Sequence, residues 1–355
     1  MTLMSTPINP RVERSPYYIV APRYIGTSAG VRALHLLCHW LNLKGERAFI
    51  ALQYIELGPS ISFDLQTPIL TPEIVDYHYQ QGVQPIVIYP EVVAGNPLEA
   101  DCVVRWLLNF PGLLGGNNSY PASEMLIGFS KTLSDSVGEH VPVLHIPVIN
   151  ESVFNPGKTP QPRKGSAFYA MKYKVVHDGK VFGIPPDAIE ITRDLPNSQT
   201  PEEIAQILRS VEALYVFENT ALATEAVLCG CPAVFMPNTW LDEPIALNEL
   251  GWDGFAWGND PAEIERARQT VPQGQLNYQR LVDKFFVQLD AFRAASQAKA
   301  AELPYTHKVT LKFLVPSPSA DIKDIPNIVF RAARQHLRRY PMLVRLRRFI
   351  RKIWK

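Results

Sequence analysis

The chain has 355 residues, of which 46% are hydrophobic and 19% are charged, and its formal net charge is +1. This composition is typical of a globular protein and excludes an intrinsically disordered one, and the length allows two domains because single cores stop growing near ~250–300 residues. The sequence has no run of eighteen uncharged apolar residues, which argues against a membrane-spanning helix.

The first half of the chain alternates strand-like and helix-like segments. Short apolar runs predict five strands, at residues 17–22, 47–52, 85–90, 124–130 and 141–148. Residues 31–45, which end at a glycine, and residues 101–110 are predicted to be helices. Strands that alternate with helices favour a parallel sheet covered on both faces.

The same alternation starts again after residues 155–165, whose Pro, Gly and Lys content indicates a linker. Four further strands are predicted, at residues 166–172, 187–192, 212–218 and 232–237, and three helices, at residues 200–211, 220–230 and 275–302. We therefore predict a first domain over residues 1–154 and a second over 166–320, each a doubly wound α/β unit.

Residues 321–355 differ from the rest of the chain. From Arg331 onward this tail carries ten Lys or Arg side chains and no acid, and apolar residues recur along it at helical spacing. Such a basic amphipathic helix favours an anionic membrane surface, bound through residues 328–355. Packing of the tail on the first domain is the alternative. Nucleic acid is not an expected partner, because the chain before this tail shows no basic face with aromatic side chains among its positive charges.

Residues 1–16 lack the apolar stretch of a signal peptide, so we expect a cytoplasmic protein on the inner face of a membrane. The cysteines lack zinc-ribbon spacing and are expected to be free buried thiols: Cys38, Cys102, Cys229 and Cys231. His35 and His39 lie one helical turn apart, but a third zinc ligand is not evident. Neither a metal nor a cofactor is therefore expected.

One segment after a predicted strand has the features of a ligand site. Glu218 ends the strand and Thr220 opens a helix, at the edge of a parallel sheet where ligands bind. The N–H groups of Thr220 and Ala221 lack helical partners and suit a phosphate. Glu225, further along the helix, could accept hydrogen bonds from ribose hydroxyls. The alternative is that Glu225 is only a solvated helix residue.

The pattern Glu225-Ala226-x-x-x-Gly230-x-Pro232 resembles a signature of nucleotide-sugar glycosyltransferases with the two-domain GT-B fold, in particular the retaining, family-4-like group. The loop Gly26–Gly30 resembles the glycine-bearing first loop of that fold, and residues 143–156 are similar to its junction before the linker. The resemblance implies two Rossmann-like domains facing a cleft, with the acceptor on the first and the donor on the second.

The resemblance also implies roles for single residues. Glu225 would bind the ribose of the donor. The phosphates or sugar of the donor would lie between two groups of residues. The second domain would contribute Asn219, Thr220, Ala221, Lys172 and Lys174, and the first loop would contribute Gly26, Thr27 and Gly30. Glu218 would be the catalytic partner of Glu225, although six residues separate the two here and seven in the retaining members.

Two residues after the strand at 85–90 are further candidates. Glu91 directly follows the strand and is a candidate catalytic residue, and Asn96 in the next turn is a candidate acceptor contact. A helix N-terminus and a lysine would stabilise the departing diphosphate without a metal. The expected activity is hexosyl or deoxyhexosyl transfer to a glycan or lipid-linked acceptor in cell-surface polysaccharide assembly, with retention. A sugar-nucleotide epimerase and a non-catalytic nucleotide-sugar binding protein are the alternatives.

Overall fold

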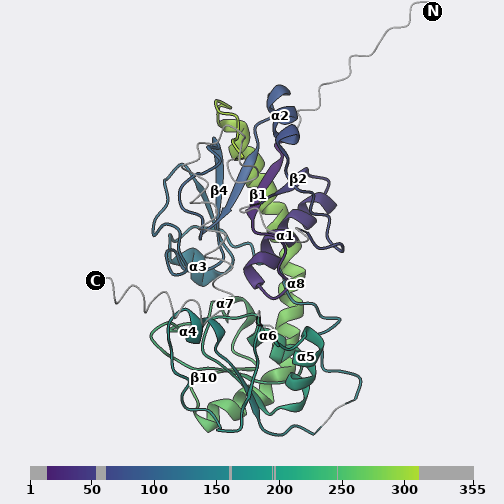
Figure 1. Ribbon diagram of the computed structural model, residues 1–355, viewed down its shortest axis with the longest axis vertical. Coiled ribbons are helices and arrows are strands. Elements are labelled where there is room, and N and C mark those ends of the chain that lie inside the picture. Colours follow the sequence, from purple (N-terminus) through teal and green to yellow (C-terminus); the bar gives the residue numbers. More distant parts are fainter. Residues whose placement is uncertain are drawn as a thin grey trace, which may run out of the picture.

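The computed structural model describes residues 14–52, 61–159, 162–193, 195, 197–245 and 247–311, and the tail predicted over residues 321–355 lies outside them. Figure 1 shows two lobes stacked along the long axis, with α8 (Pro261–Glu302) running from one to the other. Among the described helices, α8 included, none combines the length and the apolar character needed to cross a bilayer.

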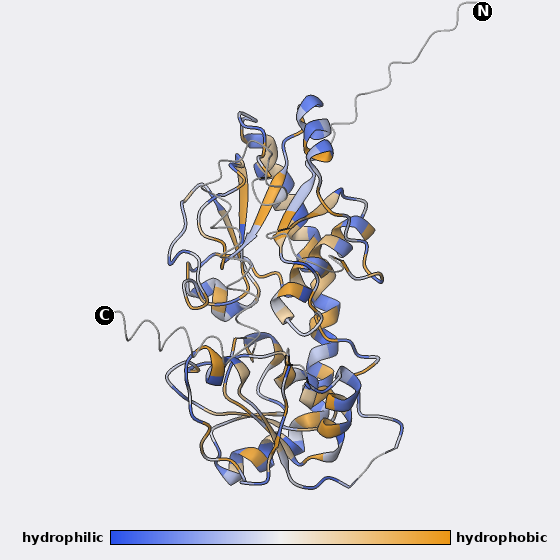
Figure 2. Ribbon diagram, viewed as in Figure 1, coloured by the Kyte–Doolittle hydropathy of each residue, from blue (hydrophilic) through white to orange (hydrophobic). Residues whose placement is uncertain are grey.

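The first lobe contains a five-stranded sheet with the order β2-β1-β3-β4-β5, in which every pair is parallel. Its strands are β1 (Tyr17–Ala21), β2 (Ala48–Leu52), β3 (Ile86–Pro90), β4 (Cys102–Leu107) and β5 (Met125–Gly128). Its helices are α1 (Ala29–Leu43), α2 (Pro72–Gln80) and α3 (Lys131–Asp135). Alternate residues of β1 enter two different hydrophobic clusters, so both faces of the sheet are covered. Figure 2 shows these strands as mostly hydrophobic and α2 as largely hydrophilic.

The second lobe contains a second parallel sheet, with the order β10-β9-β8-β6-β7. Its strands are β6 (Ser166–Tyr169), β7 (Ile189–Glu190), β8 (Ala213–Val216), β9 (Ala233–Phe235) and β10 (Phe255–Trp257). Its helices are α4 (Met171–Val175), α5 (Pro201–Ser210), α6 (Leu222–Leu228) and α7 (Leu247–Leu250), followed by α8. Two separate parallel sheets with helices confirm the predicted fold class.

Two predicted elements in the first lobe are wrong. Residues 101–110 do not form a helix: β4 occupies the space between β3 and β5, and all six of its residues are buried. Residues 141–148 do not form a strand, and their only bridge in the described sheets pairs Val143 with Gly128. Pro142 and Pro147 lack the N–H groups that a longer ladder would need.

The long final helix begins earlier than predicted, at Pro261, where the Asp260 side chain accepts a hydrogen bond from Ala262 N–H. Leu281 of α8 packs in the core of the second lobe, whereas Phe285 packs in the core of the first. After α8 the chain stays on the first lobe, where Thr310 N–H donates to Leu98 O at 3.0 Å. The packing thus assigns Phe285 and the residues beyond it to the first core, although the sequence placed them in the 166–320 domain.

Candidate active site at the domain boundary

The carboxyl edges of the two sheets face each other. Helix α1, which follows β1, contacts α6, which follows β8, through Arg32 and Glu225. Helix α3, which follows β5, meets α7: Asn248 Nδ2 donates to Thr132 Oγ1 at 2.9 Å. Ligands of open parallel sheets bind at this edge, so the candidate site lies at the boundary between the two lobes.

Glu91 is a buried acid on the first-lobe side of this boundary. The residue is 3% exposed, and its Oε2 accepts a hydrogen bond from Leu108 N–H at 2.9 Å. Burial raises the pKa of Glu91 from 4.5 to about 7, against the lowering effects of backbone N–H groups and of the Lys172 charge. Because Lys172 belongs to the second lobe, this effect connects the two lobes electrostatically.

A glycine loop covers the backbone of Glu91. Gly116 has φ of +81°, and a Cβ there would come within 1.9 Å of Glu91 O. Only glycine permits both this conformation and this close approach. Tyr120, at the end of the same loop, has a buried hydroxyl without a hydrogen-bond partner among the described residues, and burial raises its pKa to about 12.

Glu218 is a second buried acid, on the opposite side of the boundary. It follows β8 and is 7% exposed, and its Oε2 accepts a hydrogen bond from Tyr173 N–H at 2.8 Å, at the start of α4. Its Oε1 is buried and lacks a partner within the described part of the chain. Burial raises the pKa of Glu218, and the Lys172 charge opposes this shift.

The two candidate lysines on α4 have different surroundings. Lys172 is exposed, and its charge lowers the pKa of both Glu91 and Glu218. Lys174 Nζ instead forms a 2.6 Å ion pair with Glu190 Oε1. Side chains two residues apart point in nearly opposite directions from a helix. Lys172 is therefore the cation associated with the buried acids, and Lys174 has a partner elsewhere on the second lobe.

Glu225 lies at the domain boundary but is not solvated. It is 0% exposed, and its Oε1 lies 3.2 Å from Arg32 Nη2 while its Oε2 lies 2.5 Å from Arg193 Nη2. The alternative of a solvated helix residue is therefore wrong. Both carboxylate oxygens are already paired, one of them with the opposite lobe.

The residues before Glu225 organise the loop and the start of α6. Asn219 Nδ2 donates to Glu243 O, and its Oδ1 accepts from Ile245 N–H, so this amide holds the loop after β9. Thr220 Oγ1 accepts from Leu222 N–H at 3.2 Å. The helix begins at Leu222, later than predicted, and Ala221 at its N-cap position makes no side-chain cap bond.

The loop Gly26–Gly30 leads into α1 and packs beside Leu108. Ser28 caps α1 by accepting from Val31 N–H at 3.5 Å. A Cβ at Gly30 would lie 3.8 Å from Leu108, whose N–H is bonded to Glu91. Neither Gly26 nor Gly30 has a positive φ, so the backbone conformation alone does not require glycine. Thr27, between them, lies at the same edge of the first sheet.

Asn96 holds its own loop. Its Oδ1 accepts from Tyr89 Oη–H at 2.9 Å and from Ala100 N–H at 3.0 Å, and its Nδ2 donates to Ala100 O at 2.8 Å. These hydrogen bonds hold the loop between Tyr89 and Ala100 together. They give Asn96 a structural role in addition to the predicted acceptor contact.

Three buried arginines are important here but were not identified from sequence. Arg32 and Arg193 pair with Glu225, and Arg105 of β4 binds Glu124 through two hydrogen bonds. The sequence around Arg105 could have indicated its role, because a charge inside an apolar run must have a buried partner. The sequence around Arg32 and Arg193 indicates no such role, because their partner is distant in sequence.

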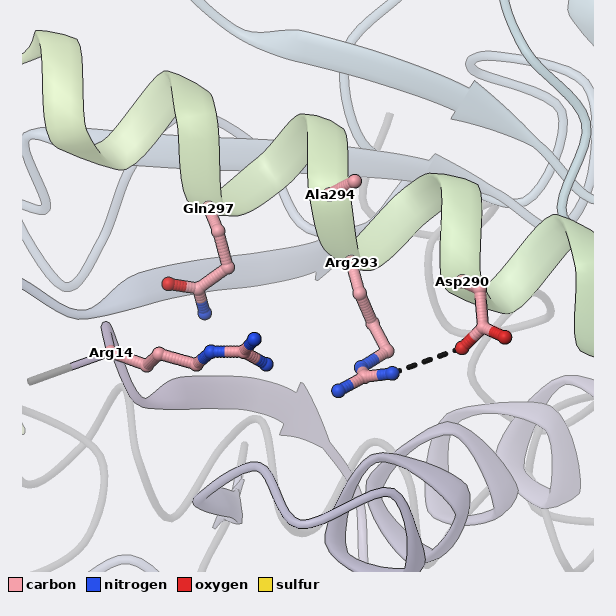
Figure 3. A pocket seen from close by; sticks show the side chains of 5 residues that line it. All are labelled: Arg14, Asp290, Arg293, Ala294 and Gln297. Carbon is pink, nitrogen blue, oxygen red and sulfur yellow. Dashed lines mark hydrogen bonds and ion pairs between the residues drawn. The ribbon is translucent and has the colours of Figure 1, made fainter.

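Two histidines and a surface pocket lie outside the candidate site. His35 Nε2 lies 3.0 Å from Pro22 O, and His39 Nδ1 accepts from Gln66 N–H, so each has a structural partner. No cluster of three potential metal ligands occurs in the described ranges. A cavity of about 190 Å³ lies between Arg14 and α8. Figure 3 shows side chains that line it, among them Arg293 and Gln297. Arg14 precedes β1, so this pocket is not at the carboxyl edge.

The sequence matches no family model and no curated protein. Solved structures that are similar include the glycosyltransferase SnogD from Streptomyces nogalater, with 13% identity over 79% of this chain and 99% of that one and a TM-score of 0.40. T4 phage BGT in complex with UDP and Mn²⁺ has 9% identity, the same coverages and a TM-score of 0.43. A glycosyltransferase from Rickettsia africae has 10% identity over 89% of this chain and 99% of that one, with a TM-score of 0.40. At these identities and TM-scores the likeness does not define an activity.

Proposed function

We propose that this chain is a glycosyltransferase that takes a sugar from a nucleotide-sugar donor bound at the domain boundary. One observation carries the proposal: Glu91 and Glu218, buried acids from opposite lobes, have raised pKa values and both respond to the charge of Lys172. Perturbed acids grouped around a cation at the ligand-binding edge of two parallel sheets are typical of an active site.

The chemistry follows from these charges. Glycosyl transfer develops negative charge on the departing diphosphate, which Lys172 would stabilise. Glu91, with a pKa of about 7, is suited to exchange a proton with an acceptor hydroxyl at neutral pH. Glu218 accepts hydrogen bonds from the N–H groups at the start of α4 and so positions the helix that carries Lys172.

The residues around this group would hold the rest of the donor. We assign the ribose to Glu225 and the phosphates or sugar to residues on both sides of the boundary: Asn219, Thr220, Ala221, Gly26, Thr27 and Gly30. The resemblance to the retaining, family-4-like group supports retention of configuration, which NMR of the product anomer tests. The acceptor would be a glycan or lipid-linked saccharide, and residues 328–355 would hold the enzyme at the cytoplasmic face of an anionic membrane.

Acceptor-dependent release of nucleoside diphosphate tests the proposal. Wild-type protein should release it from one sugar nucleotide only when an acceptor is present. Lys172→Met should lower the rate about a hundredfold or more, because a stabilising charge is lost. Lys174→Met, on the same helix but paired with Glu190, is the matched control and should keep its rate. A donor that binds without being consumed, whatever the acceptor, would instead identify a binding protein.

The two buried carboxyls also favour a second candidate, a sugar-nucleotide epimerase, which needs acid and base groups around the sugar ring. An epimerase would introduce solvent deuterium at a carbon of the sugar in the absence of any acceptor. Mass spectrometry of the sugar nucleotide after incubation in D₂O separates the two activities, since a glycosyltransferase leaves the unreacted donor unlabelled.

A further inference from the structure

Glu225, Arg32 and Arg193 form a buried charge cluster across the domain boundary. The three residues are 0%, 8% and 7% exposed. Two guanidinium groups and one carboxylate leave one positive charge in excess within the cluster. Burial of an unbalanced charge is costly unless a partner is available. Glu151, whose charge acts on Tyr278 as those of Arg32 and Glu225 do, is exposed and accepts a hydrogen bond from Gln279.

The two arginines are held unequally. Arg193 belongs to the same lobe as Glu225, and its Nη2 lies 2.5 Å from Oε2. Arg32 comes from α1 of the other lobe, and its Nη2 lies 3.2 Å from Oε1. The Nε of Arg32 is buried and lacks an acceptor among the described residues. Arg32 thus makes the longer of the two contacts, across the domain boundary, and it retains an unused hydrogen-bond donor.

The position of Arg32 faces the expected path of the donor. It lies in the first turns of α1, directly after the loop Gly26–Gly30 and at the end of the helix where the dipole favours anions. Glu225 is fully buried, so a ribose can reach its carboxylate only if a neighbouring group moves away. The long contact to Arg32 is the one that separation of α1 from α6 would break.

We propose that Arg32 exchanges partners when the donor binds. It holds Glu225 in the empty protein and binds the diphosphate of the sugar nucleotide in the loaded one, and Oε1 of Glu225 then becomes available to the ribose. The proposal rests on the function proposed above and adds to it an anion ligand from the first lobe. A diphosphate offers acceptors to both Nη2 and Nε, which a single carboxylate oxygen does not. Arg193 stays with Glu225 throughout and keeps that carboxylate paired.

Calorimetric titration with inorganic pyrophosphate tests the exchange, because this probe contains the anion without sugar or base. Arg32→Met should weaken binding about tenfold or more, as expected for loss of a charge-assisted pair. Glu225→Gln should have the opposite effect and tighten binding, since the competing carboxylate is gone. Arg280→Met removes a charge from an exposed position of α8 and is the matched control, expected to bind as the wild type does.

The opposite signs make the proposal falsifiable. If Arg32→Met binds pyrophosphate as well as the wild type, or better, Arg32 only connects the two lobes through Glu225, and the exchange is wrong. If Glu225→Gln weakens binding as Arg32→Met does, the carboxylate is not a competitor, and the exchange is also wrong. Circular dichroism shows whether each variant is folded. Arg32→Lys keeps the charge but not the planar guanidinium group, so its affinity for pyrophosphate should lie between those of the wild type and Arg32→Met.

Failure of the exchange is distinct from failure of the proposed function. A wild-type protein that binds pyrophosphate through Arg32 but consumes no sugar nucleotide contradicts glycosyl transfer and leaves the anion site in place. A wild-type protein that transfers sugar but does not bind pyrophosphate contradicts the anion site and leaves the activity in place.

Discussion

Burial controls the protonation of Glu91, and the direction of this effect can be followed with pH. Its pKa rises from 4.5 in an exposed chain to about 7 in the fold. Between these values the unfolded chain loses the proton and the folded chain keeps it, so the free energy of unfolding falls as pH rises. The loss amounts to about 3 kcal/mol and is complete above pH 7.

Glu91→Gln should therefore be more stable than the wild type at pH 8, by up to about 3 kcal/mol, and nearly equal to it at pH 4. Urea denaturation at the two pH values measures this difference. A stability difference that is the same at both pH values would mean that the fold does not raise the pKa of Glu91.

The same substitution should lower the rate of transfer by about 10²- to 10⁴-fold if Glu91 acts as a base. In the wild type, kcat/KM should rise with pH and level off above about 7, as the carboxyl of Glu91 ionises. Measurement of the pH profile of both proteins checks this. A wild-type rate that does not change between pH 5 and 8 would argue against Glu91.

At the scale of elements, β4 shows how a charge is accommodated inside a sheet. Arg105 is 0% exposed, donates to Glu124 through two nitrogens, and donates to the carbonyls of Val93 and Gly95. Its guanidinium also lies 5.0 Å from the ring centroid of Tyr89 and 5.1 Å from that of Tyr120. Arg105 thus joins the loop that follows Glu91 to the segment that contains Tyr120 and Glu124.

Arg105→Met should lower the free energy of unfolding by about 3–5 kcal/mol, because it leaves the Glu124 carboxylate buried and unpaired. The double variant with Glu124→Leu should recover much of this loss, since both charges are then removed. Denaturant titration of the two variants measures the difference. Equal stability of the single and double variants would show that Glu124 does not depend on Arg105.

The sequence predicted most elements, and the exceptions have physical causes. Residues 101–110 form a short apolar run, and such a run does not distinguish a buried strand from a helix. The start of α8 was missed because Pro272 and Gly274 are typical helix breakers. In the structure a Cβ at Gly274 would lie 2.3 Å from Asp253 O, so glycine is needed there for packing inside the helix.

The candidate site was predictable only in part. Glu218, Glu225 and Glu91 follow strands or open helices, which is a local pattern that sequence can show. The pairing of Glu225 with Arg32 joins residues 193 positions apart, and no local pattern indicates it. The hydrogen bonds of Asn96 and Asn219 to their own loops likewise depend on the folded backbone.

At the scale of the whole molecule, α8 joins the two cores. Leu281 packs with the second sheet and Phe285, one turn later, with the first. Both side chains are almost completely buried, at 3% and 1% exposure. Their placement makes a single helix part of both hydrophobic cores, on either side of the boundary that carries the candidate site.

Leu281→Ala and Phe285→Ala form a matched pair for this arrangement. Each should cost about 2–5 kcal/mol, through lost burial and a residual cavity. Hydrogen exchange should show the faster opening in β8 and β9 for Leu281→Ala, and in β1 and β4 for Phe285→Ala. The same exchange pattern in both variants would mean that the two cores open as one unit.

Thermal denaturation with a panel of nucleoside diphosphate sugars tests binding at the domain boundary most directly. A ligand at a hundred times its Kd adds about 2.7 kcal/mol to the folded state. We expect at least one sugar nucleotide to raise the Tm of the wild type and of Lys174→Met, and to raise that of Lys172→Met much less. If no sugar nucleotide stabilises the wild type, or if Lys172→Met responds fully, the boundary is not a nucleotide-sugar site built around Lys172.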